Sequence, residues 1–154
     1  PSNSGKTSLI VKVSNILQDM GNKVCIVKHD PKDKARFDRA GKDSDKFSQT
    51  GADVAVVSPN RTTVFKQNSS TIEEMASMFG EFDYLLVEGL KTLPLPRIAI
   101  FRNSLDEKYF KVTNAIASDD TINDNDIPTG IDKLDLNNPE LIIKWIEKNA
   151  QRVK

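Results

Sequence analysis

The chain has 154 residues, which is enough for one domain with a hydrophobic core. Its 22 basic and 22 acidic residues cancel, so no overall field favours nucleic acid or an anionic membrane surface as a partner. No apolar run approaches the roughly 20 residues of a membrane span. The single cysteine, Cys25, cannot form an internal disulfide, and its apolar neighbours indicate a buried thiol.

The first residues match the end of a phosphate-binding P-loop. Gly5-Lys6-Thr7 completes a pattern that runs Gly, four residues, Gly-Lys-Ser/Thr. Backbone N–H groups of such a loop and of the next helix surround phosphate oxygens, while the lysine reaches the β- and γ-phosphates and the hydroxyl binds magnesium. The first glycine of the pattern and its strand would precede Pro1, so we expect that strand to be missing from the chain as written. The predicted nucleotide contacts are Asn3, Ser4, Gly5, Lys6, Thr7 and Ser8.

A helix and a buried strand are expected after this loop. Residues 9–20 place apolar side chains on one helical face, and Gly21 is a suitable stop. Residues 24–27 form a short apolar run, typical of a parallel strand that is covered on both faces. The run ends in Lys28-His29-Asp30-Pro31, and ligands of open α/β sheets lie at the carboxyl ends of strands.

The middle of the chain begins with a polar loop and continues with a hairpin. Residues 31–46 are dense in both charges and lack a clear apolar period, which indicates a functional or mobile loop. A short helix is expected to open at Lys42-Asp43-Ser44 and to end at Gly51. Two β-rich runs, 54–57 and 62–65, predict an antiparallel hairpin that would suit dimerisation. Thr71 and Glu74 then have the spacing of a capping box at the start of a helix.

The last part of the chain adds further strands and a final helix. Residues 82–89 resemble a Walker B strand, whose Glu88 could hold magnesium through water. Strands are expected over 97–101 and over 114–118, the second of which runs into Asp119. Residues 121–138 are interpreted as a polar connection, and Pro139 as the start of a helix. That helix is expected to bury Leu141, Ile142, Trp145 and Ile146. The alternation predicts a three-layer α/β fold, a mostly parallel sheet with an antiparallel hairpin extension.

Six separated motifs occur in a recognisable order. They are Pro1 to Thr7, Val27-Lys28-His29-Asp30, Gly41-Lys42-Asp43-Ser44, Gly51-Ala52, Val87-Glu88-Gly89-Leu90-Lys91 and Ala117-Ser118-Asp119. Together they resemble the molybdopterin-guanine dinucleotide biosynthesis accessory proteins, the MobB family, over nearly the whole chain. The resemblance implies a single P-loop NTPase domain over residues 1–154. It also implies a cytoplasmic, GTP-binding homodimer with weak GTPase activity at most.

The resemblance also implies roles for particular residues and partners. Thr7, Asp30 and Glu88 would surround Mg²⁺, and Asp119 would accept hydrogen bonds from the guanine base. The partners would be a molybdopterin nucleotidyltransferase of the MobA type and molybdopterin or the molybdenum cofactor. Contacts to substrate or partner would come from Lys28, His29, Lys42, Asp43 and Lys91.

Two other classes of protein are weighed against this adapter. The first is a P-loop phosphotransferase or ligase similar to dethiobiotin synthetase, in which Asp30 would act as the base. The guanine motif Asn-Lys-x-Asp is absent from the sequence, so base choice depends on the resemblance and Asp119. The second is a metallochaperone GTPase, but one cysteine and one histidine cannot supply a three- or four-ligand site within one subunit. His29 could still contribute a ligand across a dimer.

Overall fold

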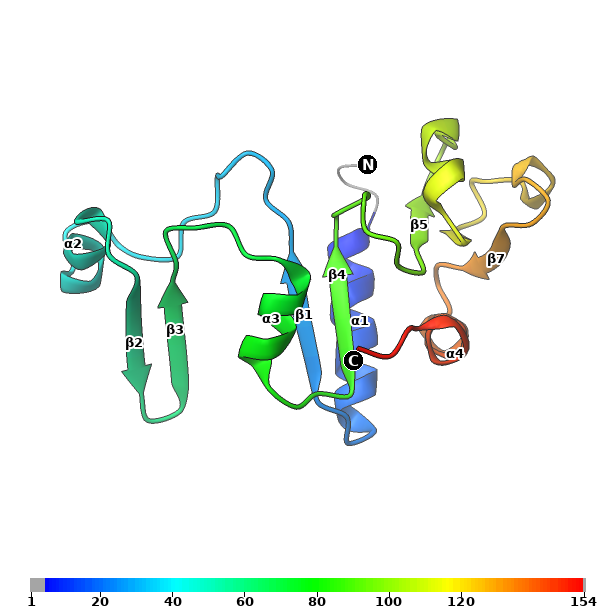
Figure 1. Ribbon diagram of the computed structural model, residues 1–154. Coiled ribbons are helices and arrows are strands. Elements are labelled where there is room, and N and C mark those ends of the chain that lie inside the picture. Colours follow the sequence, from blue (N-terminus) through cyan, green and yellow to red (C-terminus); the bar gives the residue numbers. More distant parts are fainter. Residues whose placement is uncertain (1–4, 154) are drawn as a thin grey trace. The chain divides into compact units, whose positions relative to one another are not determined.

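A computed structural model describes residues 5–153 (Figure 1). These residues form two compact units. The first contains the chain up to His29 and from Phe79 onwards, and the second contains Asp30–Met78. None of the helices in residues 5–153 is long and apolar enough to cross a membrane.

The helix that follows the P-loop motif is α1, Lys6–Asp19. It buries Leu9, Val13 and Leu17, which share one face at helical spacing and confirm the predicted amphipathic helix. The helix ends before Gly21, whose φ of 90° lies in the left-handed region that glycine adopts readily. The Gly21 N–H donates to the Gln18 carbonyl oxygen at 2.9 Å and so closes the last turn.

Two parallel sheets belong to the first unit. Strand β1 (Val24–Lys28) pairs with β4 (Tyr84–Glu88), and Lys28 lies beside Glu88 at the carboxyl ends. The other sheet has the order β5-β6-β7, with strands Ile98–Phe101, Ala115–Ser118 and Asp132–Asp135. Within the described residues no ladder joins the two sheets. The strand expected before Pro1 stays a prediction.

The three-stranded sheet has a hydrophobic cluster on each face. On one face Ile100 and Ala117 join the buried residues of α1 and of α4, which spans Pro139–Asn149. On the other face Phe101 and Ile116 pack with Tyr109 of the 3₁₀ helix η1, Glu107–Val112. Alternate strand residues therefore face two different layers, as the α/β prediction requires.

The second unit contains the hairpin. The helix α2 (Asp43–Gln49) precedes β2 (Val54–Ser58) and β3 (Arg61–Phe65), which pair antiparallel as predicted. The helix α3 (Ile72–Phe79) begins with the expected capping box. The Thr71 N–H donates to Glu74 Oε2 at 3.0 Å, and the Glu74 N–H donates to Thr71 Oγ1 at 3.2 Å.

One expectation for the C-terminal part was wrong and another only partly right. Residues 121–138 are not only a polar connection, because they contain β7 and the short 3₁₀ helix η2, Asp124–Asp126. In α4 Ile142 is buried and Ile146 packs against the core, as predicted. Leu141 is instead 44% exposed, and Ile143 is buried. Trp145 is half-buried, and its indole Nε1–H donates to Asp132 Oδ2 of β7 at 2.7 Å.

Candidate nucleotide-binding site

The start of α1 has the geometry of an anion-binding helix N-terminus. Gly5 is the N-cap, with φ 90° and ψ 12°, and its carbonyl oxygen accepts the first helical hydrogen bond from the Leu9 N–H at 2.9 Å. Within the described residues no side chain caps this end, and the first turn has no acidic residue. The first backbone N–H groups of the helix therefore have no intrahelical partner and fit a phosphate group.

The predicted phosphate contacts divide into described and undescribed residues. Lys6 is half-buried, and Thr7 and Ser8 are exposed in the first turn of α1. Asn3 and Ser4 lie outside the described residues. The part of the loop that the structure describes therefore has a lysine, two hydroxyls and the helix N-terminus together, which suits a magnesium nucleotide.

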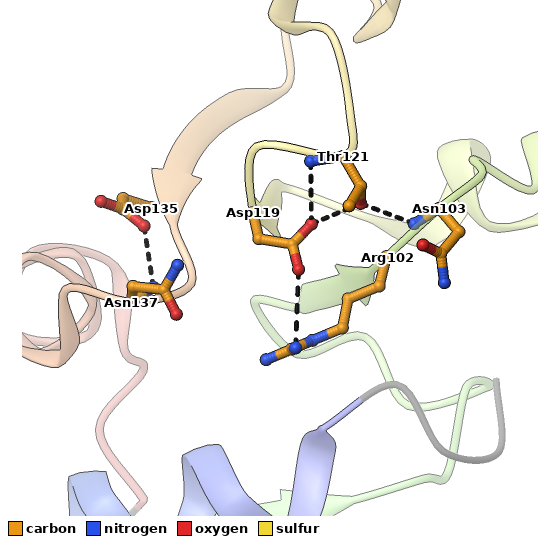
Figure 2. A network of polar contacts seen from close by, with 6 residues as sticks. All are labelled: Arg102, Asn103, Asp119, Thr121, Asp135 and Asn137. Atoms are coloured by element: carbon orange, nitrogen blue, oxygen red, sulfur yellow. Dashed lines mark hydrogen bonds and ion pairs between the residues drawn. The ribbon is translucent and has the colours of Figure 1, made fainter.

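An arginine that the sequence analysis did not select lies beside this loop. Arg102 follows β5, and a Cβ atom added to Gly5 would be 3.5 Å from its Nε and 3.6 Å from its Nη2. The Arg102 Nη1 is 3.5 Å from Asp119 Oδ2. Figure 2 shows the guanidinium between Asp119 and the first turn of α1. Ligands of open α/β sheets lie at the carboxyl ends of strands, and Arg102 directly follows the strand predicted over 97–101. The sequence therefore contained a signal that could have selected Arg102.

Asp119 follows β6 and contacts protein groups through both carboxylate oxygens. Its Oδ1 accepts hydrogen bonds from the N–H and the hydroxyl of Thr121, and its Oδ2 faces Arg102. The Thr121 hydroxyl hydrogen bond, with the Thr121 N–H and the charge of Arg102, holds the pKa of Asp119 below its usual value. Asp119 is thus ionised at neutral pH. To bind guanine, as predicted, it would have to share or exchange these partners.

Strand β6, which Asp119 follows, is the middle strand of its sheet. Strand β7 pairs with β6 on the side away from β5, and Asp135 ends it. Asp135 Oδ1 accepts a hydrogen bond from the Asn137 N–H at 2.8 Å, as Figure 2 shows. The three parallel strands therefore place Arg102, Asp119 and Asp135 in a row at their carboxyl ends.

The other sheet brings together three more of the predicted residues. Lys28 lies beside Glu88 in the parallel ladder, and the His29 N–H donates to the Glu88 carbonyl oxygen at 2.9 Å. Gly89 follows with φ 92°, and a Cβ at this position would lie 3.0 Å from the His29 Cβ. A glycine is therefore required at position 89 by backbone conformation and by the close approach of His29.

The loop after Gly89 is held by Arg97. Its guanidinium donates to the carbonyl oxygens of Gly89, Leu90 and Leu93 at 3.2, 3.0 and 3.4 Å. Partial burial lowers the pKa of Arg97, which stays a cation at neutral pH. Lys91, predicted to contact substrate or partner, donates to the Tyr109 hydroxyl at 2.8 Å and lies 4.0 Å from the centre of that ring.

Three predicted residues belong to the second unit. The Asp30 carboxylate accepts hydrogen bonds from the N–H groups of Lys34 and Ala35, both at 2.6 Å. Lys42 is the exposed N-cap of α2, and the Asp43 carboxylate pairs with Lys46 at 3.9 Å. The roles of Asp30, Lys42 and Asp43 in catalysis, in metal binding or at a partner stay predictions.

A magnesium site at Thr7, Asp30 and Glu88 also stays a prediction. In residues 5–153 no group of three or more His, Cys, Asp or Glu side chains is arranged to hold a metal ion. The predicted site is of a different kind, because nucleotide phosphates and a threonine hydroxyl would supply part of its ligands.

Comparison with known proteins gives consistent matches. Residues 1–119 match the model of the MobB family, described as molybdopterin guanine dinucleotide synthesis protein B. A Methanocaldococcus jannaschii protein, named as a molybdopterin-guanine dinucleotide biosynthesis adapter protein, is 30% identical over 106 residues. The match covers 65% of this chain and 44% of the archaeal protein, so the chain spans less than half the length of that relative. The Haemophilus influenzae adapter protein of the same name is 27% identical over 153 residues, covering 95% of this chain and 83% of the relative.

Solved structures share the fold. The crystal structure of Bacillus subtilis MobB superposes with a TM-score of 0.73 at 20% identity, covering 99% of this chain and 95% of that one. Another structure, titled molybdopterin-guanine biosynthesis protein B, gives a TM-score of 0.72 at 22% identity over 96% of this chain and 94% of that one. These likenesses confirm the predicted P-loop NTPase type of α/β fold.

Proposed function

The chain belongs to the MobB family of molybdopterin guanine dinucleotide synthesis proteins, and from this we propose that it is a GTP-binding adapter in that synthesis. The observation that carries the proposal is the start of α1. There the left-handed Gly5, the uncapped helix N-terminus and Lys6 together fit the phosphates of a nucleotide. The names of the relatives support the adapter role.

In this proposal the first turn of α1 binds the phosphate chain. The N–H groups of residues 5–8 donate to phosphate oxygens, and the Lys6 ammonium contacts the β- and γ-phosphates. Asn3 and Ser4 complete the loop, and Ser8 contacts the α-phosphate. Each contact to a charged oxygen is stronger than a contact between neutral groups, so the loop favours triphosphate over monophosphate.

Magnesium would neutralise part of the phosphate charge. The Thr7 hydroxyl is a direct ligand in this proposal, and Glu88 and Asp30 hold water molecules of the ion. The position of Glu88 at the carboxyl end of β4 supports its part. The contact of the guanine base with Asp119, the residue that follows β6, stays a prediction.

The proposed partner is a molybdopterin nucleotidyltransferase of the MobA type, with molybdopterin or the molybdenum cofactor as the shared ligand. Lys28, His29, Lys42, Asp43 and Lys91 would supply contacts to it. A cytoplasmic homodimer is proposed through the β2–β3 hairpin. In support of this, Val56, Val57 and Val64 of the hairpin are 38%, 77% and 44% exposed.

Two measurements separate this adapter from a P-loop phosphotransferase or ligase. The full natural chain is assayed for GTP and ATP turnover, and a molybdopterin nucleotidyltransferase is tested for capture on the immobilised chain. An adapter captures the transferase and turns over GTP far more slowly than the roughly 1 per second of phosphotransferases. Turnover near that rate on a small acceptor, or failure to capture the transferase, would contradict the proposal.

A further inference from the structure

We infer that Arg102 is a phosphate-binding residue of the nucleotide site and that Asp119 positions it. The inference rests on the proposed function, because it assigns Arg102 to the same P-loop. It gives Asp119 a role that differs from reading the guanine base.

The Arg102 guanidinium has one edge toward Asp119 and the other toward Gly5. Its Nη1 edge faces Asp119 Oδ2, at 3.5 Å. The atoms closest to Gly5 are Nε and Nη2, at 3.5 and 3.6 Å from the position of an added Cβ. Nε and Nη2 form a fork of two parallel N–H donors that matches two oxygens of a phosphate. Among residues 5–153 the structure gives this fork no hydrogen-bond acceptor.

The charges around the start of α1 favour a bound anion. A helix N-terminus carries a partial positive charge, so a cation beside it is unfavourable. Here Arg102 lies against Gly5, the N-cap of α1, and Lys6 is the first residue of the same helix. The first turn of α1 contains no acidic residue, and the carboxylate that contacts Arg102 is that of Asp119. An anion that contacts both the fork and the N–H groups of the first turn would turn this repulsion into attraction.

Arg102 is held in place by neighbouring polar groups. Thr121 donates to Asp119 through both its N–H and its hydroxyl, and its hydroxyl oxygen accepts from the Asn103 N–H at 2.7 Å. Asn103 is the residue after Arg102, so the contacts form a closed ring that links the ends of β5 and β6 (Figure 2). A positioned arginine loses less side-chain entropy when it binds a phosphate.

A purely structural ion pair explains this arrangement less well. The Arg102 side chain is 44% exposed and that of Asp119 is 11% exposed. Water and salt therefore screen the arginine end of the pair and reduce its contribution to stability. The ion pair also uses one edge of the guanidinium and leaves the other directed at the P-loop.

The test compares Arg102→Met with Arg102→Lys in the full natural chain. Binding of GTP, GMP and guanosine is measured by titration calorimetry in magnesium buffer at fixed salt. Arg152→Met is the matched control, because Arg152 is exposed near the C-terminus. We expect Arg102→Met to weaken GTP binding about tenfold, because one charge-assisted hydrogen bond is lost, and to leave guanosine binding unchanged. Arg102→Lys should recover part of the loss, and Arg152→Met should bind like the natural chain.

Asp119→Asn tests the positioning role. Asparagine keeps the shape of the side chain but lacks the charge that faces Arg102. The affinities for GTP and for xanthosine triphosphate should therefore fall by the same factor. A base-reading carboxylate behaves differently. It accepts from the guanine N1–H and amino group, so the asparagine variant would instead prefer xanthine, whose C2 oxygen accepts a hydrogen bond.

The possible outcomes separate the two proposals. Tight GTP binding by the natural chain with unchanged binding by Arg102→Met would overturn the inference and leave the proposed function standing. Equal losses for GTP and guanosine in Arg102→Met would show a structural role and also overturn it. A switch to xanthosine triphosphate in Asp119→Asn would overturn the positioning role. No GTP binding by the natural chain would overturn both the proposed function and the inference.

Discussion

Replacing Gly89 with alanine should destabilise the first unit through two separable effects. The first is backbone strain, since a φ of 92° costs a residue with a Cβ about 1 kcal/mol or more. The second is a steric clash, because the new Cβ would lie 3.0 Å from the His29 Cβ. Overpacking of this kind costs about 1 to 3 kcal/mol. The expected loss in unfolding free energy is therefore roughly 2 to 4 kcal/mol.

A matched glycine isolates the clash. Gly21 has a φ of 90°, but an added Cβ there would have no atom within 4 Å. Gly21→Ala should therefore cost about 1 kcal/mol, from strain alone. Removing the imidazole by His29→Ala should not rescue Gly89→Ala, because alanine keeps the Cβ that causes the clash, whereas His29→Gly should recover part of the loss.

Urea unfolding measures these differences. Trp145 is the single tryptophan and lies in α4 of the same unit, so its fluorescence reports the unfolding of that unit. If Gly89→Ala destabilises no more than Gly21→Ala, the packing of His29 against Gly89 is wrong. If Glu88 holds the magnesium ion as proposed, Gly89→Ala should also weaken GTP binding.

Three further predictions concern hydrogen bonds. Asp119→Asn should lower the melting temperature at pH 7, because the lowered pKa of Asp119 stabilises the fold where the carboxylate is ionised. The difference should shrink as the pH falls below the ordinary aspartate pKa of about 4 and vanish only below the lowered pKa of Asp119. A difference that persists at low pH would argue against this. Thr71→Ala should cost about 1 kcal/mol in urea unfolding by removing the cap that pairs with Glu74, and no loss would contradict the capping box. Arg97→Met should cost about 2 kcal/mol and speed amide exchange in residues 89–93, because Arg97 binds the carbonyl oxygens of Gly89, Leu90 and Leu93. Unchanged exchange would mean that the loop is held by other contacts.

Local patterns in the sequence predicted the elements whose stability is decided locally. Three of these features depend only on residues that are close in sequence. They are the apolar face of α1, the paired β-rich runs of the hairpin and the Thr71–Glu74 spacing. Strand β7 was missed because Asp-Lys-Leu-Asp is polar and its strand is held by backbone pairing to β6. In the final helix, whether Leu141 or Ile143 is buried depends on how the helix meets the sheet.

In the candidate site, too, the sequence predicted the residues that form local motifs and missed those that tertiary contacts bring together. The P-loop motif and the acidic end of β4 are continuous in sequence and could be found from it. The ring of Arg102, Asp119 and Thr121 joins the ends of two strands about 17 residues apart, so it depends on which strands are neighbours. The rule that ligands lie at carboxyl ends of strands could have selected Arg102, but not its contact with Asp119.

GTP binding with magnesium at the start of α1 can be tested directly by calorimetric titration of GTP and ATP into the full natural chain and into Lys6→Ala. We expect saturable binding of one GTP per chain and weaker binding of ATP. In Lys6→Ala the GTP affinity should fall at least about tenfold, because a charge-assisted contact to phosphate is lost. Tighter binding of ATP than GTP, or undiminished GTP binding by Lys6→Ala, would show that the start of α1 is not a GTP site.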